Sequence, residues 1–380
     1  MMRFVCIKLL ALVCLVGLTI SCKDDPKKEA LPTGSDSDRG LMLTNIADNI
    51  VIPAYAKFDV KLANMIAKSD AFRANPTTTT LTDLRTAWQD AYIEWQKVAL
   101  FDFGPAADNG LTGFMNIYPT DTIAIKANIT SGTASLETPG SYSAQGFPAL
   151  DYLINGIATT DDAIITLYTD TEADKRKAYL LQLTNQMHTK FSLVKNTWTS
   201  TYRNIFVATT GTGLYSSTSL MVNGIVSYYE RHLRSGKFGI PSGSMTGGTL
   251  ISTSVEAYYS EEIAKTLAQT AHQAFVDFFN GKGVTTGTEG PSLKTYLNSL
   301  GAKDATTQVL LSEKINTQFG VVNDKLALLT TEDLSSEVSS TNNSNMIAVY
   351  TAMQGEIKML KVDMTSAMSI TITYTDNDGD

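Results

Sequence analysis

Apolar side chains recur at helical spacing over most of this 380-residue chain, and this periodicity restricts the fold more than any other feature. Positions three and four apart lie on one face of an α-helix, so each stripe predicts a helix with one buried side. Four such stripes precede residue 234. Their members are Ile46, Ile50, Tyr55, Phe58, Leu62, Met65 and Ile66; Leu84, Trp88, Tyr92, Trp95 and Val98; Leu180, Leu183, Met187, Phe191, Val194, Trp198 and Tyr202; and Leu214, Met221, Ile225, Tyr229 and Leu233.

Further helices are predicted after residue 260. Ser260 is followed by two acidic residues, which is an N-terminal capping signal. Alternation typical of a strand appears only at 370–374. A βαβ fold needs repeated short strands, so the pattern favours an all-α fold of two bundles of about four helices that meet near residue 206. The later helices are expected at 263–278, 293–300, roughly 305–329 and 346–368.

Glycine and proline interrupt the helical pattern in three places. Pro53 is expected to kink or break the first helix. The segment 103–145 is predicted to be a long loop, and its interleaved aromatic residues indicate that it packs over the helices. The glycine-rich segment 234–253 is predicted to be a flexible loop, with an anion-binding arrangement of backbone N–H groups as the alternative.

The first 21 residues have the layout of a secretory signal peptide. Arg3 and Lys8 precede an apolar run that is shorter than the roughly 20 residues needed to span a bilayer. The run ends at Ser21 and Cys22, which resembles a bacterial lipobox, so we expect Cys22 to carry palmitate and to become the mature N-terminus. Ordinary cleavage beside a coincidental cysteine is the alternative.

Residues 22–40 are predicted to be a lipid anchor and flexible tether, because they are charged and rich in Pro, Gly and Ser. Lys23, Asp24 and Asp25 resemble a signal that directs some lipoproteins to the outer face of the outer membrane, although a generic charged linker explains them equally well. We therefore expect a cell-envelope, outer-membrane lipoprotein.

Cysteine content and charge narrow the class of protein further. Cys6 and Cys14 lie in the removed segment, so no disulfide can form afterwards and stability must come from a large core. Loss of Arg3 and Lys8 changes the net charge from −8 to −10, and the remaining basic residues are scattered. Nothing in this charge distribution indicates a nucleic-acid partner.

The sequence gives little support to the common hydrolytic sites. His188, His232 and His272 are far apart, and neither a HExxH nor a GxSxG motif occurs. Residues Asp376–Asp380 resemble the start of a calcium loop but lack the closing glutamate, so we interpret 371–380 as an acidic tail. The remaining candidate is 145–153, which also reads as an ordinary helix start.

Six motifs stand out along the chain: Trp88–Trp95, Phe101–Pro105, Tyr118-Pro119, Gly146–Asp151, Gly236–Pro241 and Val255–Ser260. Together these motifs resemble the imelysin family, whose members are bacterial lipoproteins and periplasmic proteins associated with iron uptake. The resemblance implies two helical bundles related by internal duplication, at 41–206 and 207–370, with long loops packed at their interface. It also implies a site at that interface built around a GxHxxE motif.

The chain departs from the family motif. Gly146 matches its glycine, but Pro148 stands in place of the histidine and Asp151 in place of the glutamate. Histidine and glutamate three residues apart share a helix face and can bind a metal together, and this pair is broken here. Asp151 would need at least Glu94 or Glu256 as a further ligand, because hard cations take several oxygen atoms.

We therefore expect a non-enzymatic envelope protein that binds iron or an iron-bearing ligand, beside iron or haem transport components. The alternatives are a metal-dependent peptidase with a rearranged site, as the family's label for insulin-cleaving peptidases would suggest, and a module that binds a peptide or glycan. No residue pattern identifies the ligand. The cofactor is also unknown, and iron is the only candidate. The expected ligand-binding residues are Trp88, Glu94, Trp95, Tyr118, Gly146, Pro148, Asp151, Tyr152, Lys237 and Tyr259.

Overall fold

The computed structural model describes residues 35–339 and 343–375, and the regular elements within these ranges are all helices. The all-α prediction is therefore confirmed. The strand-like segment 370–374 forms no strand: Asn223 binds it instead, through Thr371 O at 3.0 Å and Thr373 N at 2.7 Å. The predictions for the signal peptide, Cys22 and the end of the acidic tail lie outside the described residues.

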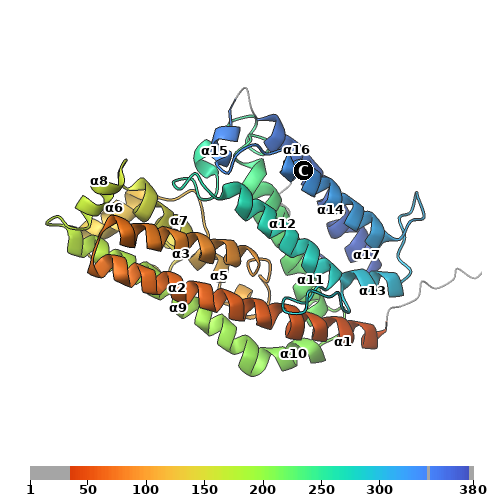
Figure 1. The fold of residues 1–380 in the computed structure, drawn as a ribbon. Coiled ribbons are helices and arrows are strands. Elements are labelled where there is room, and N and C mark those ends of the chain that lie inside the picture. Colours follow the sequence, from red (N-terminus) through yellow and green to blue (C-terminus); the bar gives the residue numbers. More distant parts are fainter. Residues whose placement is uncertain (1–34, 340–342, 376–380) are drawn as a thin grey trace, which may run out of the picture. The chain divides into compact units, whose positions relative to one another are not determined.

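Three long helical rods, each with a buried apolar face, build the first half. The first rod consists of α1 and α2, which are joined by the π-helical turn η1. The second rod is α3, and the third is α9, which continues through the π-helical turn η4 into α10. α2 packs between α3 and α9 (Figure 1). The bounds are α1 Asp36–Asn45, η1 Ile46–Val51, α2 Ile52–Ala74, α3 Thr78–Gln96, α9 Ala173–Thr197, η4 Trp198–Tyr202 and α10 Arg203–Ala208.

The second half is also built from long helices. α14 packs against α12 and α16, and the π-helical η5 packs against α16. Figure 1 shows α12 and α14 side by side. The bounds are α11 Ser217–Tyr228, η5 Tyr229–Gly239, η6 Ser252–Ser254, α12 Ala264–Asn280, α13 Leu293–Ser299, α14 Leu311–Ala327, α15 Leu334–Glu337, α16 Ser344–Lys358, η7 Met359–Met364 and α17 Thr365–Ala367.

The segment 103–145 contains short helices, so the prediction of one long loop was wrong. The expected packing over the helices is confirmed, because α5 and α6 contact α9. Pro105, Gly110 and Gly132 lie at the ends of these short helices, where they start or stop a turn. The bounds, with the elements that follow, are α4 Pro105–Asp108, α5 Leu111–Met115, α6 Thr122–Ser131, η2 Pro139–Ala144, α7 Gly146–Asp151, η3 Tyr152–Gly156 and α8 Asp161–Leu167.

Three other local predictions need correction. Pro53 does not break the first rod: it lies in the first turn of α2, directly after the π-helical turn η1. The segment 234–253 stays helical as far as Gly239, which places Lys237 on η5. Ser260 does not cap α12: Glu261 adopts a left-handed φ of 59°, and the helix begins only after Ile263.

A hydrophobic core without interruption joins the two halves of the described chain. α3 contacts α12, and α1 contacts both α11 and α13. α10 ends at Ala208 and α11 begins at Ser217, but the division near residue 206 and the internal duplication stay predictions.

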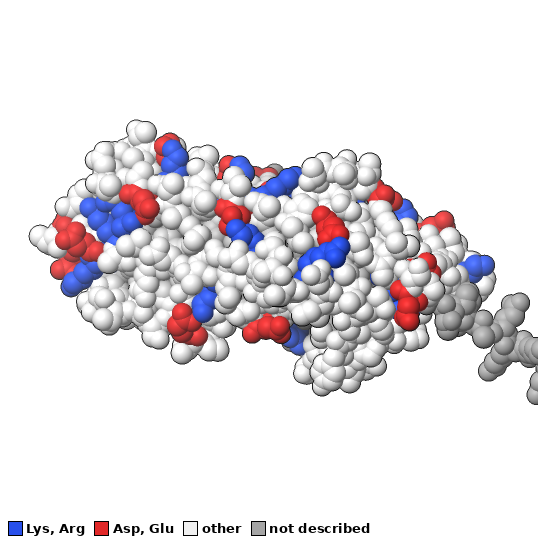
Figure 2. Space-filling view, turned by 90° about the horizontal axis from the view of Figure 1, so that it is seen from below, with Lys and Arg blue, Asp and Glu red and all other residues white. Residues whose placement is uncertain are grey.

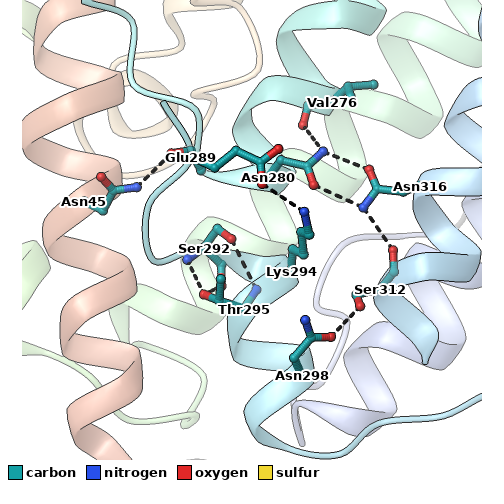
Figure 3. A network of polar contacts seen from close by, with 11 residues as sticks. Asn45, Val276, Asn280, Glu289, Ser292, Lys294, Thr295, Asn298, Ser312 and Asn316 are labelled. Carbon is teal, nitrogen blue, oxygen red and sulfur yellow. Dashed lines mark hydrogen bonds and ion pairs between the residues drawn. The ribbon is translucent and has the colours of Figure 1, made fainter. Parts of the chain in front are cut away.

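Side-chain amides fix the contacts in the second half (Figure 3). Asn280 and Asn316 exchange hydrogen bonds of 2.8 and 3.1 Å between α12 and α14, and Asn316 also donates to Ser312 O at 3.0 Å. Ser312 donates to Asn298 Oδ1 at 2.5 Å, which joins α14 to α13. Asn45 of α1 donates to backbone carbonyls on both sides of the turn that precedes α13.

The charged residues on the face shown in Figure 2 lie mainly in small groups that contain both signs, separated by uncharged surface. This face therefore presents no continuous basic area of the kind that binds nucleic acid. Among the described residues, no helix has the length and hydropathy required of a membrane-spanning segment.

Candidate functional site

Gly146 opens α7 in a conformation that only glycine can adopt here. Its φ is +73°, and a Cβ at this position would lie 2.2 Å from the carbonyl oxygen of Met115. Left-handed backbone is strained for other residues, and the contact with Met115 would add overlap. The motif glycine is therefore explained by the close approach of α5 to α7.

Pro148 is buried in the first turn of α7, where the missing N–H costs little. Its carbonyl accepts a hydrogen bond from Thr120 Oγ1 at 3.1 Å. The neighbouring Phe147 stacks on Tyr92 with ring centroids 4.5 Å apart, and Phe147 O accepts from Trp88 Nε1 at 3.2 Å. The predicted Trp88 thus holds α7 against α3.

Asp151 ties α7 to the segment that precedes α12. Its carboxylate is 1% exposed, accepts from Asn155 Nδ2 at 2.9 Å, and accepts from the backbone N–H of Tyr259 at 2.9 Å. Burial raises the pKa of Asp151 to about 7 in spite of these hydrogen bonds. Tyr152 contacts the ring of Tyr259 edge-on, with centroids 5.1 Å apart.

A buried ion pair between Lys237 and Glu256 lies where the two halves meet. Their side chains are 4% and 2% exposed. Glu256 Oε1 also accepts from Gln96 Nε2 at 3.0 Å and from Asn116 Nδ2 at 2.6 Å, while Lys237 Nζ donates to Gln96 Oε1 at 3.0 Å. Burial lowers the pKa of Lys237, and the adjacent Glu256 opposes that change.

Aromatic and imidazole groups surround this ion pair. Tyr92 donates to Asn116 Oδ1 at 2.5 Å, and burial raises the pKa of Tyr118 well above its usual range. Burial and the nearby Lys237 lower the pKa of His232 to about 4, so its imidazole is neutral at pH 7. Asn116, Tyr118 and His232 border a cavity of about 20 Å³, which has room for roughly one water molecule.

Seven of the ten predicted site residues fall into three groups, and Trp88, Gly146 and Pro148 lie where α7 packs on α3 and α5. Trp95 and Tyr118 line the small cavity with Lys237, whereas Asp151, Tyr152 and Tyr259 form a second cluster. Glu94 belongs to neither, because it faces away from both and pairs with Lys97 at 2.7 Å. Tyr92 donates to Asn116 of the small cavity and stacks on Phe147 of α7, the helix that carries Asp151. This stack connects the first two groups.

Sequence reasoning missed Gln96, Asn116, Tyr228 and His232 as members of the site. Gln96 carried a usable signal, since it follows Tyr92 by four residues and so lies on the apolar face of its helix. A polar side chain on that face must find a buried partner. Asn116 had no such signal, because its partners Tyr92 and Glu256 come from distant segments.

The donors near the motif do not fit a resident metal ion. Both oxygens of Asp151 accept N–H groups, and the carboxylate of Glu256 is neutralised by Lys237. Within 35–339 and 343–375, no group of three His, Cys, Asp or Glu side chains is placed to share an ion. The metal prediction for Asp151 with Glu94 or Glu256 stays a prediction, and we derive no chemical step through a metal.

The fold and the site together define a class: all-α proteins in which two sets of helices enclose a buried polar junction. The family model for imelysin matches residues 51–358, and the chain belongs to that family. Two solved structures share the fold. An imelysin-like protein from Psychrobacter arcticum 273-4 is 16% identical with a TM-score of 0.65, and the alignment covers 90% of this chain and 98% of that one.

The second solved structure is a putative iron-regulated protein A precursor from Parabacteroides distasonis ATCC 8503. It is 17% identical with a TM-score of 0.71, and the alignment covers 90% of this chain and 97% of that one. The curated "Iron-regulated protein A" of Synechococcus elongatus is 26% identical over 112 residues, which is 30% of each chain. The two solved structures show that the fold is shared, and the curated relative matches only part of the chain.

Proposed function

We propose that this protein is a lipoprotein of the cell envelope that acts as a non-enzymatic binding protein in the uptake of iron or an iron-bearing ligand. Its lipid on Cys22 would hold it at the outer membrane, beside iron or haem transport components. The iron connection rests on the match to a curated relative whose name describes iron regulation. The anchor rests on the signal peptide and the residues around Cys22.

One observation favours binding over catalysis: the polar groups of the junction are already ion-paired or hydrogen-bonded to other groups of the protein. Glu256 is paired with Lys237, and Asp151 accepts the N–H of Tyr259. A general base or a metal ligand needs a free lone pair that faces the substrate. The family motif loses its histidine to Pro148, whose side chain has neither a donor nor an acceptor.

The iron role is tested by growth of the source bacterium under iron limitation. We expect deletion of the gene to slow growth in chelator-treated medium, and added ferric salt to restore it. The wild-type gene should complement the defect, while Glu256→Gln should complement poorly because it leaves Lys237 buried without its counter-ion. Equal growth of the deletion and wild-type strains at every iron concentration would overturn the proposal.

The anchor is tested separately by metabolic labelling with a palmitate analogue. We expect label on the wild-type protein, which should fractionate with the outer membrane, and no label on Cys22→Ser, which should be released as an unanchored protein. A Cys14→Ser variant changes a cysteine of the removed segment and should stay labelled. Equal label on Cys22→Ser and wild type would remove the lipid from the proposal while leaving the iron role untouched.

A further inference from the structure

Glu94 lies on the face of α3 turned away from Gln96 and lines a separate cavity. Its side chain is 10% exposed, and its Oε2 accepts from Lys97 Nζ at 2.7 Å. Its Oε1 is buried and has no hydrogen-bond partner in the described part of the chain. A buried acceptor without a donor costs free energy, so a ligand that donates a hydrogen bond there would be stabilised.

This cavity, which we call the seam cavity, lies between α2 and α3 on one side and α12 with its following turn on the other. Its volume is about 280 Å³, close to the lower end of the roughly 300–1,000 Å³ typical of small-molecule sites. The rings of Phe101 and Phe278 form an apolar wall, with centroids 5.8 Å apart and an interplanar angle of 43°. This wall suits a flat, apolar ligand body.

The charges around the seam cavity favour an anion. Three lysines and two carboxylates line it. Lys97 pairs with Glu94, and Lys282 lies 3.4 Å from Asp277. Lys57 Nζ donates only to the carbonyl of Val284, at 3.0 Å, and no carboxylate of the described residues is paired with it. One ammonium group is therefore available to a carboxylate ligand.

The walls of the seam cavity are fixed in place before any ligand enters. The turn after α12 is held by Asn45, which donates to Gly281 O at 3.0 Å and to Pro291 O at 2.9 Å. Val284 N also donates to Asn49 O at 2.8 Å. An outer pocket of about 430 Å³ shares Lys57 and Glu94 with the cavity, which gives a ligand a way in. A preformed site binds with a smaller loss of entropy.

We propose that the seam cavity binds a small hydroxylated aromatic carboxylate. Its ring lies on Phe101 and Phe278, its carboxylate binds the ammonium group of Lys57, and its hydroxyl donates to Glu94 Oε1. This inference does not depend on the iron-related function, because it uses residues outside the junction of Lys237 and Glu256.

The proposal is tested by titrating residues 23–380 with 3-hydroxybenzoate, benzoate and hexanoate, followed by ligand-observed NMR. We expect a dissociation constant on the order of 0.1 mM for 3-hydroxybenzoate, which is ordinary for so small a ligand. Benzoate should bind at least threefold more weakly and hexanoate more weakly still. Absence of 3-hydroxybenzoate binding at about 5 mM, or equal binding of hexanoate, would overturn the proposal.

Variants then locate the binding. Lys57→Met should weaken binding of 3-hydroxybenzoate at least tenfold, whereas Lys175→Met, an exposed lysine of α9 outside the cavity, should leave it unchanged. Glu94→Leu should abolish the preference for 3-hydroxybenzoate over benzoate. Ala274→Trp should fill the cavity and block both ligands. Thermal melting confirms that each variant is folded, and undiminished binding in Lys57→Met and Ala274→Trp would show that the ligand binds elsewhere and contradict the proposal.

Discussion

At the scale of single residues, the junction depends on groups that cannot be replaced one at a time. Lys237 and Glu256 are both buried, and each compensates the charge of the other. Taking two charges out of water is costly, and the cost is tolerated only while both are present and hydrogen-bonded. Gln96 and Asn116 supply the remaining hydrogen bonds.

Removing one partner of this pair should destabilise the protein strongly. We expect Lys237→Met or Glu256→Gln alone to lower the free energy of unfolding by about 3–5 kcal/mol, and the double variant to lose less than the sum. Lys61→Met breaks a half-exposed pair with Asp90 and should cost about 1 kcal/mol or less. Urea titration measures all four, and additive losses at Lys237 and Glu256 would contradict a mutually compensating pair.

The left-handed glycine of the motif gives a second prediction at this scale. Gly146→Ala should destabilise by more than about 2 kcal/mol, because it combines backbone strain with overlap against Met115. Gly132 is the matched control: its φ is +69° but no atom lies within 4 Å of the added Cβ, so Gly132→Ala should cost about 1 kcal/mol. Equal losses in thermal and chemical unfolding would show that the contact with Met115 is unimportant.

Asp151 should leave a signature in the pH dependence of stability. Its folded-state pKa of about 7 lies above the ordinary value of 3.8, so the folded state holds the proton more tightly. Its contribution to stability is then fully present below pH 4 and is lost as pH rises towards 7. The profile of Asp151→Asn should lack this loss, so the difference between the two profiles should change between pH 4 and 7. A constant difference would contradict the raised pKa.

At the scale of elements, the segment before α12 is held against η3 by contacts that sequence patterns did not reveal. Tyr259 packs directly on Gly156, where an added Cβ would lie 2.1 Å from the ring, and its backbone N–H binds Asp151. The left-handed φ of Glu261 then turns the chain before α12 begins. A strong capping signal at Ser260 was therefore overridden by tertiary contacts.

Gly156→Ala should displace Tyr259 and loosen this segment. We expect faster amide hydrogen exchange at Tyr259, since its bond to Asp151 would weaken, and partial recovery of stability in Gly156→Ala/Tyr259→Ala. Gly320→Ala, in an open position on α14, should instead stabilise slightly through helix propensity. Unchanged exchange at Tyr259 would indicate that the segment is held by other contacts.

The difference between local patterns and tertiary contacts explains what could be predicted from the sequence. The long helices followed from apolar stripes such as Leu84 to Val98, because a buried face imposes its spacing on the sequence. The position of Lys237 on a helix did not follow, since glycines on both sides of it also fit a loop. Glu94 was considered as a second ligand beside Asp151 because a hard cation takes several oxygen atoms. Sequence does not show that α3 directs Glu94 into a separate cavity, while Asp151 of α7 binds the segment before α12.

At the scale of the whole molecule, the two halves share one hydrophobic core and are bridged by the ion pair of the junction. Gln96 of α3 contacts Lys237 of η5, and α3 also packs on α12. Burial of this kind couples the halves energetically. We therefore expect residues 35–375 to unfold as one unit.

Calorimetry of residues 23–380 should show a single transition whose calorimetric and van't Hoff enthalpies agree. Residues 35–208 alone should lack a cooperative transition, because separation exposes the face of α3 that packs on α12. Two resolved transitions, or a cooperative melt of the isolated first half, would contradict a shared core.

The proposed function is iron-related binding, in a protein whose junction is charge-paired and is not a metal centre. The most direct test is calorimetric titration of residues 23–380 with ferrous, ferric and zinc ions and with haem, alongside Asp151→Ala. We expect an iron species to bind and Asp151→Ala to retain this binding, because the Asp151 oxygens already accept hydrogen bonds from Asn155 Nδ2 and the N–H of Tyr259. Failure of every iron species to bind, or stoichiometric binding of a bare ion that Asp151→Ala abolishes, would contradict it.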